Sequence, residues 1–181
     1  MVKSLHKKSF SYIYLLNLVL LTSGKLFASA TLLEDVCRQT HDQPHCMNVL
    51  GSDPRTHNAD LYELGLITID LGSYSATGTK VKIHTLLLSE KDPQLRTRFV
   101  MCDDYYEDAI DSLRDAVDYL KRGDYTEFNL DGGSAYADAI DCEDAFKAPP
   151  AYISPLTDEN YRLKQFGEII TIIANMFPVK A

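Results

Sequence analysis

The chain has 181 residues and a formal net charge of −8, and 45% of its residues are hydrophobic. This length and composition predict one domain with a substantial core. The acidic balance excludes nucleic acid as a partner, because binding to phosphate needs clustered Lys and Arg side chains that this sequence lacks.

The first thirty residues predict a secretory signal peptide. Three lysines precede an apolar run over residues 12–21, and the segment closes with Ala28-Ser29-Ala30. The run is too short to span a bilayer, which needs about twenty apolar residues. We expect cleavage after Ala30, no membrane attachment, and secretion to the extracellular space (apoplast) or the vacuole. Residues 1–30 contain four lysines and no acid, so their removal lowers the net charge from −8 to −12.

The chain contains four cysteines: Cys37, Cys46, Cys102 and Cys142. A secreted protein meets oxidising surroundings, so we expect two disulfides, and the sequence leaves three pairings open. His41 and His45 lie between the first two cysteines and would complete a set of zinc ligands. Secretion favours the disulfide, and no metal is expected.

The segment from Asp60 to about Glu90 predicts the first long helix. Its apolar residues recur at helical spacing, but Gly72 and Gly78 make this the weakest helix prediction.

Three further helices follow. The second runs from Pro93 to Arg122, because proline suits a first helical turn and Gly123 suits a left-handed C-terminal cap. The third begins near Asp124 and ends before Pro149-Pro150. The fourth begins at Thr157, which is a good N-cap residue.

Four long helices joined by short turns predict an all-α fold, an up-down-up-down antiparallel four-helix bundle. The second and third helices are then neighbours. Gly123 lies about midway between Cys102 and Cys142, so an antiparallel pair in register places these cysteines at one level of the seam. The other pairings stay open on this argument alone.

Motifs for catalysis are not found in the sequence. It has neither a G-x-S-x-G nucleophile motif nor a glycine loop for phosphate. A run of carboxylates at residues 103–108 lies within a predicted helix, whereas calcium loops need glycine and alternating oxygens on a turn. We therefore predict a binding protein rather than an enzyme, with no cofactor.

Several short segments form a specific pattern when they occur in one order with the four cysteines. They are Ser52-Asp53-Pro54, Ala59 to Gly65, Lys121 to Tyr125, Cys142 to Phe146 and Ser154 to Thr157. With this pattern the chain resembles the plant invertase and pectin methylesterase inhibitor family over essentially its whole mature length. The stretch from Ser52 to Leu66 is most similar to the invertase inhibitors that include plane-tree pollen allergens.

The resemblance implies the organisation of the chain. It pairs Cys37 with Cys46 and Cys102 with Cys142. Residues 31–181 form the inhibitor domain, with an N-terminal helical hairpin over residues 31–58 and the four-helix bundle over residues 59–181.

Members of this family inhibit either an acid invertase (β-fructofuranosidase) or a pectin methylesterase, and the fold does not decide between these enzymes. In invertase inhibitors a Pro-Lys-Phe element at the turn between the second and third bundle helices enters the active-site cleft. The matching stretch predicts contacts by Asp124, Tyr125, Thr126, Glu127 and Phe128. Phe128 also fits the core periodicity of its helix, and Tyr125 also suits a cap on the bundle end.

Esterase inhibitors instead use an exposed face of the middle helices, which here includes Asp111, Asp115 and Asp118. We expect a secreted inhibitor that occludes the cleft of an acid invertase. A pectin methylesterase is the alternative target, and a non-inhibitory extracellular binding protein on the same scaffold is the third interpretation.

Overall fold

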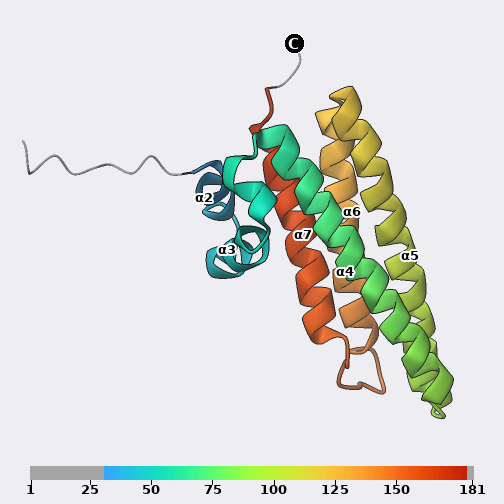
Figure 1. The fold of residues 1–181 in the computed structure, drawn as a ribbon. Coiled ribbons are helices and arrows are strands. Elements are labelled where there is room, and N and C mark those ends of the chain that lie inside the picture. The colour runs from blue at the N-terminus through green and yellow to red at the C-terminus, as the bar shows by residue number, and fades with distance from the viewer. Residues whose placement is uncertain (1–30, 179–181) are drawn as a thin grey trace, which may run out of the picture. The chain divides into compact units, whose positions relative to one another are not determined.

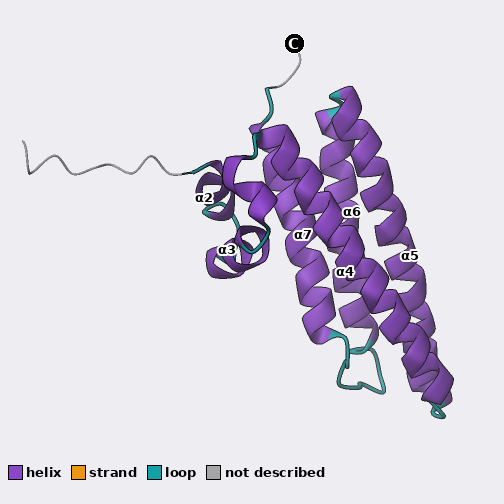
Figure 2. Ribbon diagram, viewed as in Figure 1, coloured by secondary structure: helices purple, strands orange, loops and turns teal. Residues whose placement is uncertain are grey.

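The computed structural model describes residues 31–178; the predicted signal peptide, residues 1–30, lies outside the described residues, as do residues 179–181. The described chain consists of helices and connecting loops, with no strand among these residues (Figures 1 and 2). In chain order the elements are α2 (Leu32–Cys37), α3 (Gln43–Gly51), a 3-10 helix (Pro54–Asn58), α4 (Leu61–Ser89), α5 (Pro93–Arg122), α6 (Tyr125–Ala145) and α7 (Thr157–Met176).

The four long helices form the antiparallel bundle predicted from the sequence (Figure 1). Each of α4, α5, α6 and α7 packs against two others, so that the ring is closed by contacts between α4 and α7. The short helices α2 and α3 form a hairpin that contacts α7. The core runs along the bundle and contains Leu64, Ile83, Tyr106, Leu113, Phe128, Leu163 and Ile170.

Helix α5 has the ends that its sequence predicts. Asp92 caps the first turn, and Gly123 ends the helix with φ of 69°, a left-handed conformation that glycine adopts without steric cost. The N–H of Gly123 donates to the carbonyl of Leu120 (3.0 Å), and the N–H of Asp124 donates to that of Tyr119 (2.9 Å). These bonds satisfy carbonyls of the last turn and redirect the chain into α6.

Helix α4 continues without a break through both of its mid-helix glycines. At Gly72 a Cβ atom would stand 3.2 Å from the Cβ of Phe166 on α7. The missing side chain therefore lets two helices approach closely, and this packing offsets the helix propensity that glycine lacks. The start of α4 is strengthened by a capping box between Asp60 and Glu63.

The predicted N-cap of the last helix is wrong by one residue. Leu156 occupies the N-cap position and makes no side-chain capping bond, while Thr157 is the first helical residue. The Thr157 hydroxyl donates instead to a carboxylate oxygen of Glu143 on α6 (2.9 Å). Thr157 therefore links α7 to α6 through its hydroxyl group and does not cap α7 as the sequence predicted.

Two buried disulfides join neighbouring helices. Cys37–Cys46 closes the α2–α3 hairpin, with Cα atoms 5.4 Å apart, and Cys102–Cys142 links α5 to α6, with Cα atoms 4.7 Å apart. These are the pairs that the family resemblance implies. The second pair also matches the register argument, because α5 and α6 are antiparallel neighbours on either side of the Gly123 turn.

Candidate target-binding site

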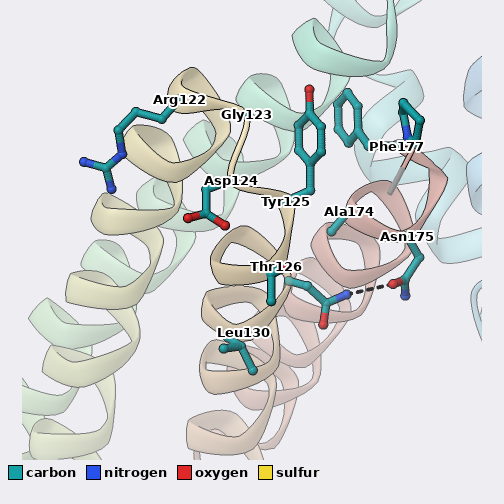
Figure 3. Close-up of a pocket in the computed structure, with 11 residues that line it drawn as sticks. Arg122, Gly123, Asp124, Tyr125, Thr126, Leu130, Ala174, Asn175 and Phe177 are labelled. Carbon is teal, nitrogen blue, oxygen red and sulfur yellow. Dashed lines mark hydrogen bonds between the residues drawn. The ribbon is translucent and has the colours of Figure 1, made fainter. Parts of the chain in front are cut away.

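The turn between α5 and α6 lies at one end of the bundle, beside the C-terminal end of α7 (Figure 3). Gly123 reverses the chain, and Asp124 then caps α6 by accepting a hydrogen bond from the N–H of Glu127 (3.3 Å). A turn fixed by a left-handed glycine and a capping carboxylate holds its neighbours in one conformation. Such rigidity lowers the entropy lost on binding.

A hollow of about 660 Å³ lies between this turn and the end of α7. Its wall combines aromatic rings, amides, a carboxylate and a guanidinium, which is the mixed chemistry of a surface that receives side chains of another protein. The lining residues are Arg122, Gly123, Asp124, Tyr125, Thr126, Asn129, Leu130, Ala174, Asn175, Phe177 and Pro178.

An aromatic pair forms one side of the hollow. The rings of Tyr125 and Phe177 are stacked, with centroids 3.9 Å apart and planes at 4° (Figure 3). Both residues are half-buried, and the stack ties the end of α7 to the start of α6. Tyr125 therefore does act as a cap on the bundle end, while part of its surface stays accessible.

The side-chain amide of Asn129, which was not predicted from the sequence as a site residue, links the same two helices a second time. The side-chain nitrogen of Asn129 donates to the carbonyl of Thr171 (3.2 Å) and to the side-chain oxygen of Asn175 (3.2 Å), as Figure 3 shows for the second bond. Asn129 lies four residues after Tyr125, one helical turn along α6. That spacing is its only signal in the sequence.

The five predicted contact residues are not all on the surface. Asp124 and Thr126 are exposed, and Tyr125 and Glu127 are half-exposed. Phe128 is fully buried, and its ring lies 3.6 Å from the position of a Cβ on Gly65 of α4. The sequence allowed either a core role or a contact role for Phe128. The structure places it in the core, so Phe128 is not available for contact at the surface of the folded protein.

A second candidate surface is the acidic side of α5 and α6. Asp115 and Asp118 are exposed on α5, and Asp111 is partly exposed. Asp131 and Asp138 of α6 lie near carboxylates of α5. In addition to partial burial, the negative charge of Asp115 raises the pKa of Asp131, and that of Asp108 raises the pKa of Asp138. Neither α6 residue was predicted from the sequence as part of a surface, although their separation of seven residues places them on one helix face.

Burial makes Asp131 and Asp138 unusual carboxyl groups. Partial removal from water, together with the negative charge of Asp115, raises the pKa of Asp131 to about 6. Partial burial and the charge of Asp108 raise the pKa of Asp138 to about 6 in the same way. The seam between α5 and α6 therefore carries negative charge that grows as the solution passes from acid to neutral.

The two histidines considered as zinc ligands have other contacts. Cys37 and Cys46 are bonded to each other, His41 contacts the carboxylate of Glu168, and His45 packs edge-on against Tyr161 with ring centroids 5.2 Å apart. Residues 31–178 contain no group of three His, Cys, Asp or Glu side chains that could hold a metal ion. Over the same residues, none of the helices combines the length with the apolar composition that a transmembrane span requires.

Comparison with known proteins places the chain among helical inhibitors. The family model described as plant invertase/pectin methylesterase inhibitor matches residues 31–173. The chain belongs to this family. The match covers the α2–α3 hairpin, both disulfides and nearly all of the bundle, as the resemblance in the sequence indicated.

Some relatives within the plant invertase/pectin methylesterase inhibitor family are named as pectinesterase inhibitors and others as invertase inhibitors. A "Pectinesterase inhibitor" from Actinidia deliciosa is 35% identical over 81% of this chain and 80% of its own length. A "Putative invertase inhibitor" from Platanus acerifolia is 32% identical over 94% of this chain and 98% of its own. A crystal structure of a mutant pectin methylesterase inhibitor from Arabidopsis superposes with a TM-score of 0.75 at 26% identity, covering 83% of this chain and 100% of that one. These relatives are named as inhibitors and not as enzymes, in line with the class predicted from the sequence.

Proposed function

We propose that this protein is a secreted inhibitor that binds a pectin methylesterase or an acid invertase and covers the active-site cleft of that enzyme. Family membership and the names of its relatives support this function. The scaffold fits it, because a disulfide-linked bundle presents a rigid surface to a partner. Inhibition of this kind requires neither a cofactor nor a covalent step. The predicted signal peptide supports the apoplast or the vacuole as its location.

A pectin methylesterase is the target that the geometry favours. An acid invertase is the first expectation from the sequence, because the stretch from Ser52 to Leu66 is most similar to invertase inhibitors. The α5–α6 turn, however, keeps at most one residue of the invertase-binding element. That residue, Phe128, is buried in the core. The acidic side of α5 and α6 is exposed at Asp115 and Asp118, and it suits a cleft whose rim carries arginine or lysine. The relative at 35% identity, named as a pectinesterase inhibitor, supports the same choice.

An acid invertase is the second candidate, and the turn supports it. Tyr125 borders the hollow at the bundle end and offers aromatic surface of the kind that anchors protein interfaces. The relative from Platanus acerifolia supports this target by its name and by its coverage of 94% of the chain. Replacement of Tyr125 by alanine tests it, since inhibition of invertase should weaken at least tenfold while that of an esterase stays nearly unchanged.

The deciding experiment measures inhibition of both enzymes. The mature, disulfide-bonded protein is titrated against a pectin methylesterase and, separately, an acid invertase at mildly acidic pH, and residual activity is recorded. We expect loss of esterase activity near one equivalent of inhibitor. Inhibition of invertase alone would reverse the order of the two candidates, and inhibition of neither would leave the non-inhibitory binding protein as the remaining interpretation.

A charge-reversal pair tests the surface. Asp115→Lys should weaken inhibition of the esterase at least tenfold, because it puts a positive charge on the acidic side of α5 and α6. Asp158→Lys, at a residue that is also exposed but lies at the start of α7, serves as the matched control and should retain full inhibition. Equal inhibition by the two variants would exclude this surface as the contact.

A further inference from the structure

Helix α4 carries large hydrophobic side chains on the side that faces solvent. Tyr74, Val81 and Leu88 have exposed fractions of 83%, 64% and 90%. They are seven residues apart, and residues at this spacing stay on one helix face with a drift of about 20° per heptad. The three side chains therefore form an outward stripe along the second half of α4.

Exposed residues beside the stripe include several without charge. Thr77, Gly78 and Thr85 are exposed and lie three or four residues from a member of the stripe. The opposite face of the same helix is buried in the bundle through Ala76 and Ile83. An exposed helix face normally carries charged side chains, so α4 has a second seam of coiled-coil spacing that no described residue of the single chain covers.

The seam is symmetric about Val81. Tyr74 lies seven residues before it and Leu88 seven residues after it, so two antiparallel copies of α4 related by a two-fold axis at Val81 bring Leu88 of one copy to Tyr74 of the other. A hollow of about 380 Å³ lies beside Tyr74, between α4 and α7. A Cβ on Gly78, which lines this hollow, would meet no atom within 4 Å. In this pairing the exposed Leu88 side chain of one copy lies at the hollow beside Tyr74 of the other copy.

The charges beside the seam permit this pairing. On the α7 side, Lys82 pairs with Glu159 (3.0 Å). On the α5 side, Lys80 and His84 both lie against Asp103, at 3.4 Å and 3.0 Å. Both flanks therefore present basic and acidic groups together, so each can pair with the same flank of a second copy. The carboxylate-rich side of α5 and α6, in contrast, would repel its own copy.

We propose that the stripe of α4 over residues 74–88 is the interface of a weak antiparallel homodimer. The contact is short, about 21 Å for the fourteen steps of 1.5 Å that separate Tyr74 from Leu88. An interface of this extent falls at the small end of specific interfaces. We therefore expect weak association, with a dissociation constant on the order of 10⁻⁵ M. The inference does not depend on which enzyme the protein inhibits.

Analytical ultracentrifugation of the mature protein with its disulfides intact tests the dimer. Between about 1 and 300 μM, a range that spans the expected association, the mean mass should rise from monomer toward dimer. Val81→Glu places two carboxylates at the two-fold axis and should raise the dissociation constant at least tenfold. Ile153→Glu, on a loop residue that is 96% exposed, should leave it unchanged. A monomer at every concentration, or equal effects of the two variants, would overturn the proposal.

A covalent probe tests the register. All four native cysteines are in disulfides, so a cysteine introduced at position 81 is the only free thiol. Val81→Cys should form a disulfide-linked dimer under mild oxidation much faster than Ile153→Cys, and equal rates would reject the symmetric seam. Val81→Glu should also inhibit the target enzyme as the unmodified chain does. Lost inhibition with unaltered self-association would assign the stripe to the target instead of a second copy.

Discussion

At the scale of single residues, Phe128 is the one predicted contact residue of the α5–α6 turn that a partner cannot reach in the folded protein. Its ring is fully buried against α4. Phe128→Ala should lower the free energy of unfolding by about 3–5 kcal/mol, because it removes buried apolar surface and leaves a cavity. Urea denaturation followed by circular dichroism measures the change.

The matched control for this prediction is two residues along the same helix. Leu130 is 56% exposed, and Leu130→Ala should change the free energy of unfolding by less than about 1 kcal/mol. Similar losses in the two variants would show that Phe128 is no more buried than Leu130 in solution.

At the scale of elements, the contact between α6 and α7 depends on glycine. A Cβ on Gly167 would stand 2.6 Å from the backbone oxygen of Gly132 and 2.7 Å from the backbone nitrogen of Tyr136. Backbone atoms of a packed helix cannot move aside individually, so the helices would have to separate. We expect Gly167→Ala to destabilise the protein by about 3 kcal/mol, measured as a lower midpoint of thermal unfolding.

A neighbouring glycine supplies the opposite expectation. A Cβ on Gly133 of α6 would meet no atom within 4 Å. Gly133→Ala should therefore stabilise the protein by about 0.5–1 kcal/mol, because alanine favours the helix and nothing opposes its methyl group. If both substitutions shifted the midpoint in the same direction, helix propensity or general strain would account for them and close packing would not.

At the scale of the whole molecule, the acidic surface makes stability depend on pH. Asp131 and Asp138 have pKa values of about 6 in the folded protein, and a carboxyl group in the unfolded chain titrates near 4. The folded state binds these protons more tightly, so their stabilising contribution is complete below about pH 4 and is lost as the pH rises through 6.

A double variant isolates this effect. Asp131→Asn with Asp138→Asn should be more stable than the unmodified chain at pH 7, by about 1 kcal/mol once solvent screening is allowed for. The difference should disappear near pH 4, where the native carboxyl groups are also neutral. Denaturation at pH 4, 5.5 and 7 measures it, with Asp104→Asn, an exposed change on α5, as the control. A constant difference at all three values would contradict the raised pKa values.

Much of the fold follows from local signals. Asp92 with Pro93 marks the start of α5 and Gly123 its end, because capping and left-handed backbone depend on residues close in sequence. Local signals are incomplete for the same reason: Gly72 weakened the prediction of a helix that does form, and Thr157 was wrongly expected to cap α7. The sequence reveals the helix propensity of glycine and the capping ability of threonine, but it does not reveal that α7 packs onto Gly72 or that Glu143 takes the Thr157 hydroxyl.

The sequence by itself determined the four-helix class, the ends of most helices and the family, since helical periodicity and cysteine order are properties of the linear chain. Only the tertiary structure decided that Phe128 is core while Tyr125 remains partly accessible, and that Asp131 and Asp138 share a seam with carboxylates of α5. It also decided that the stripe through Val81 faces solvent. The physical reason is that periodicity assigns residues to a face of a helix, whereas the neighbouring helices determine which faces they cover.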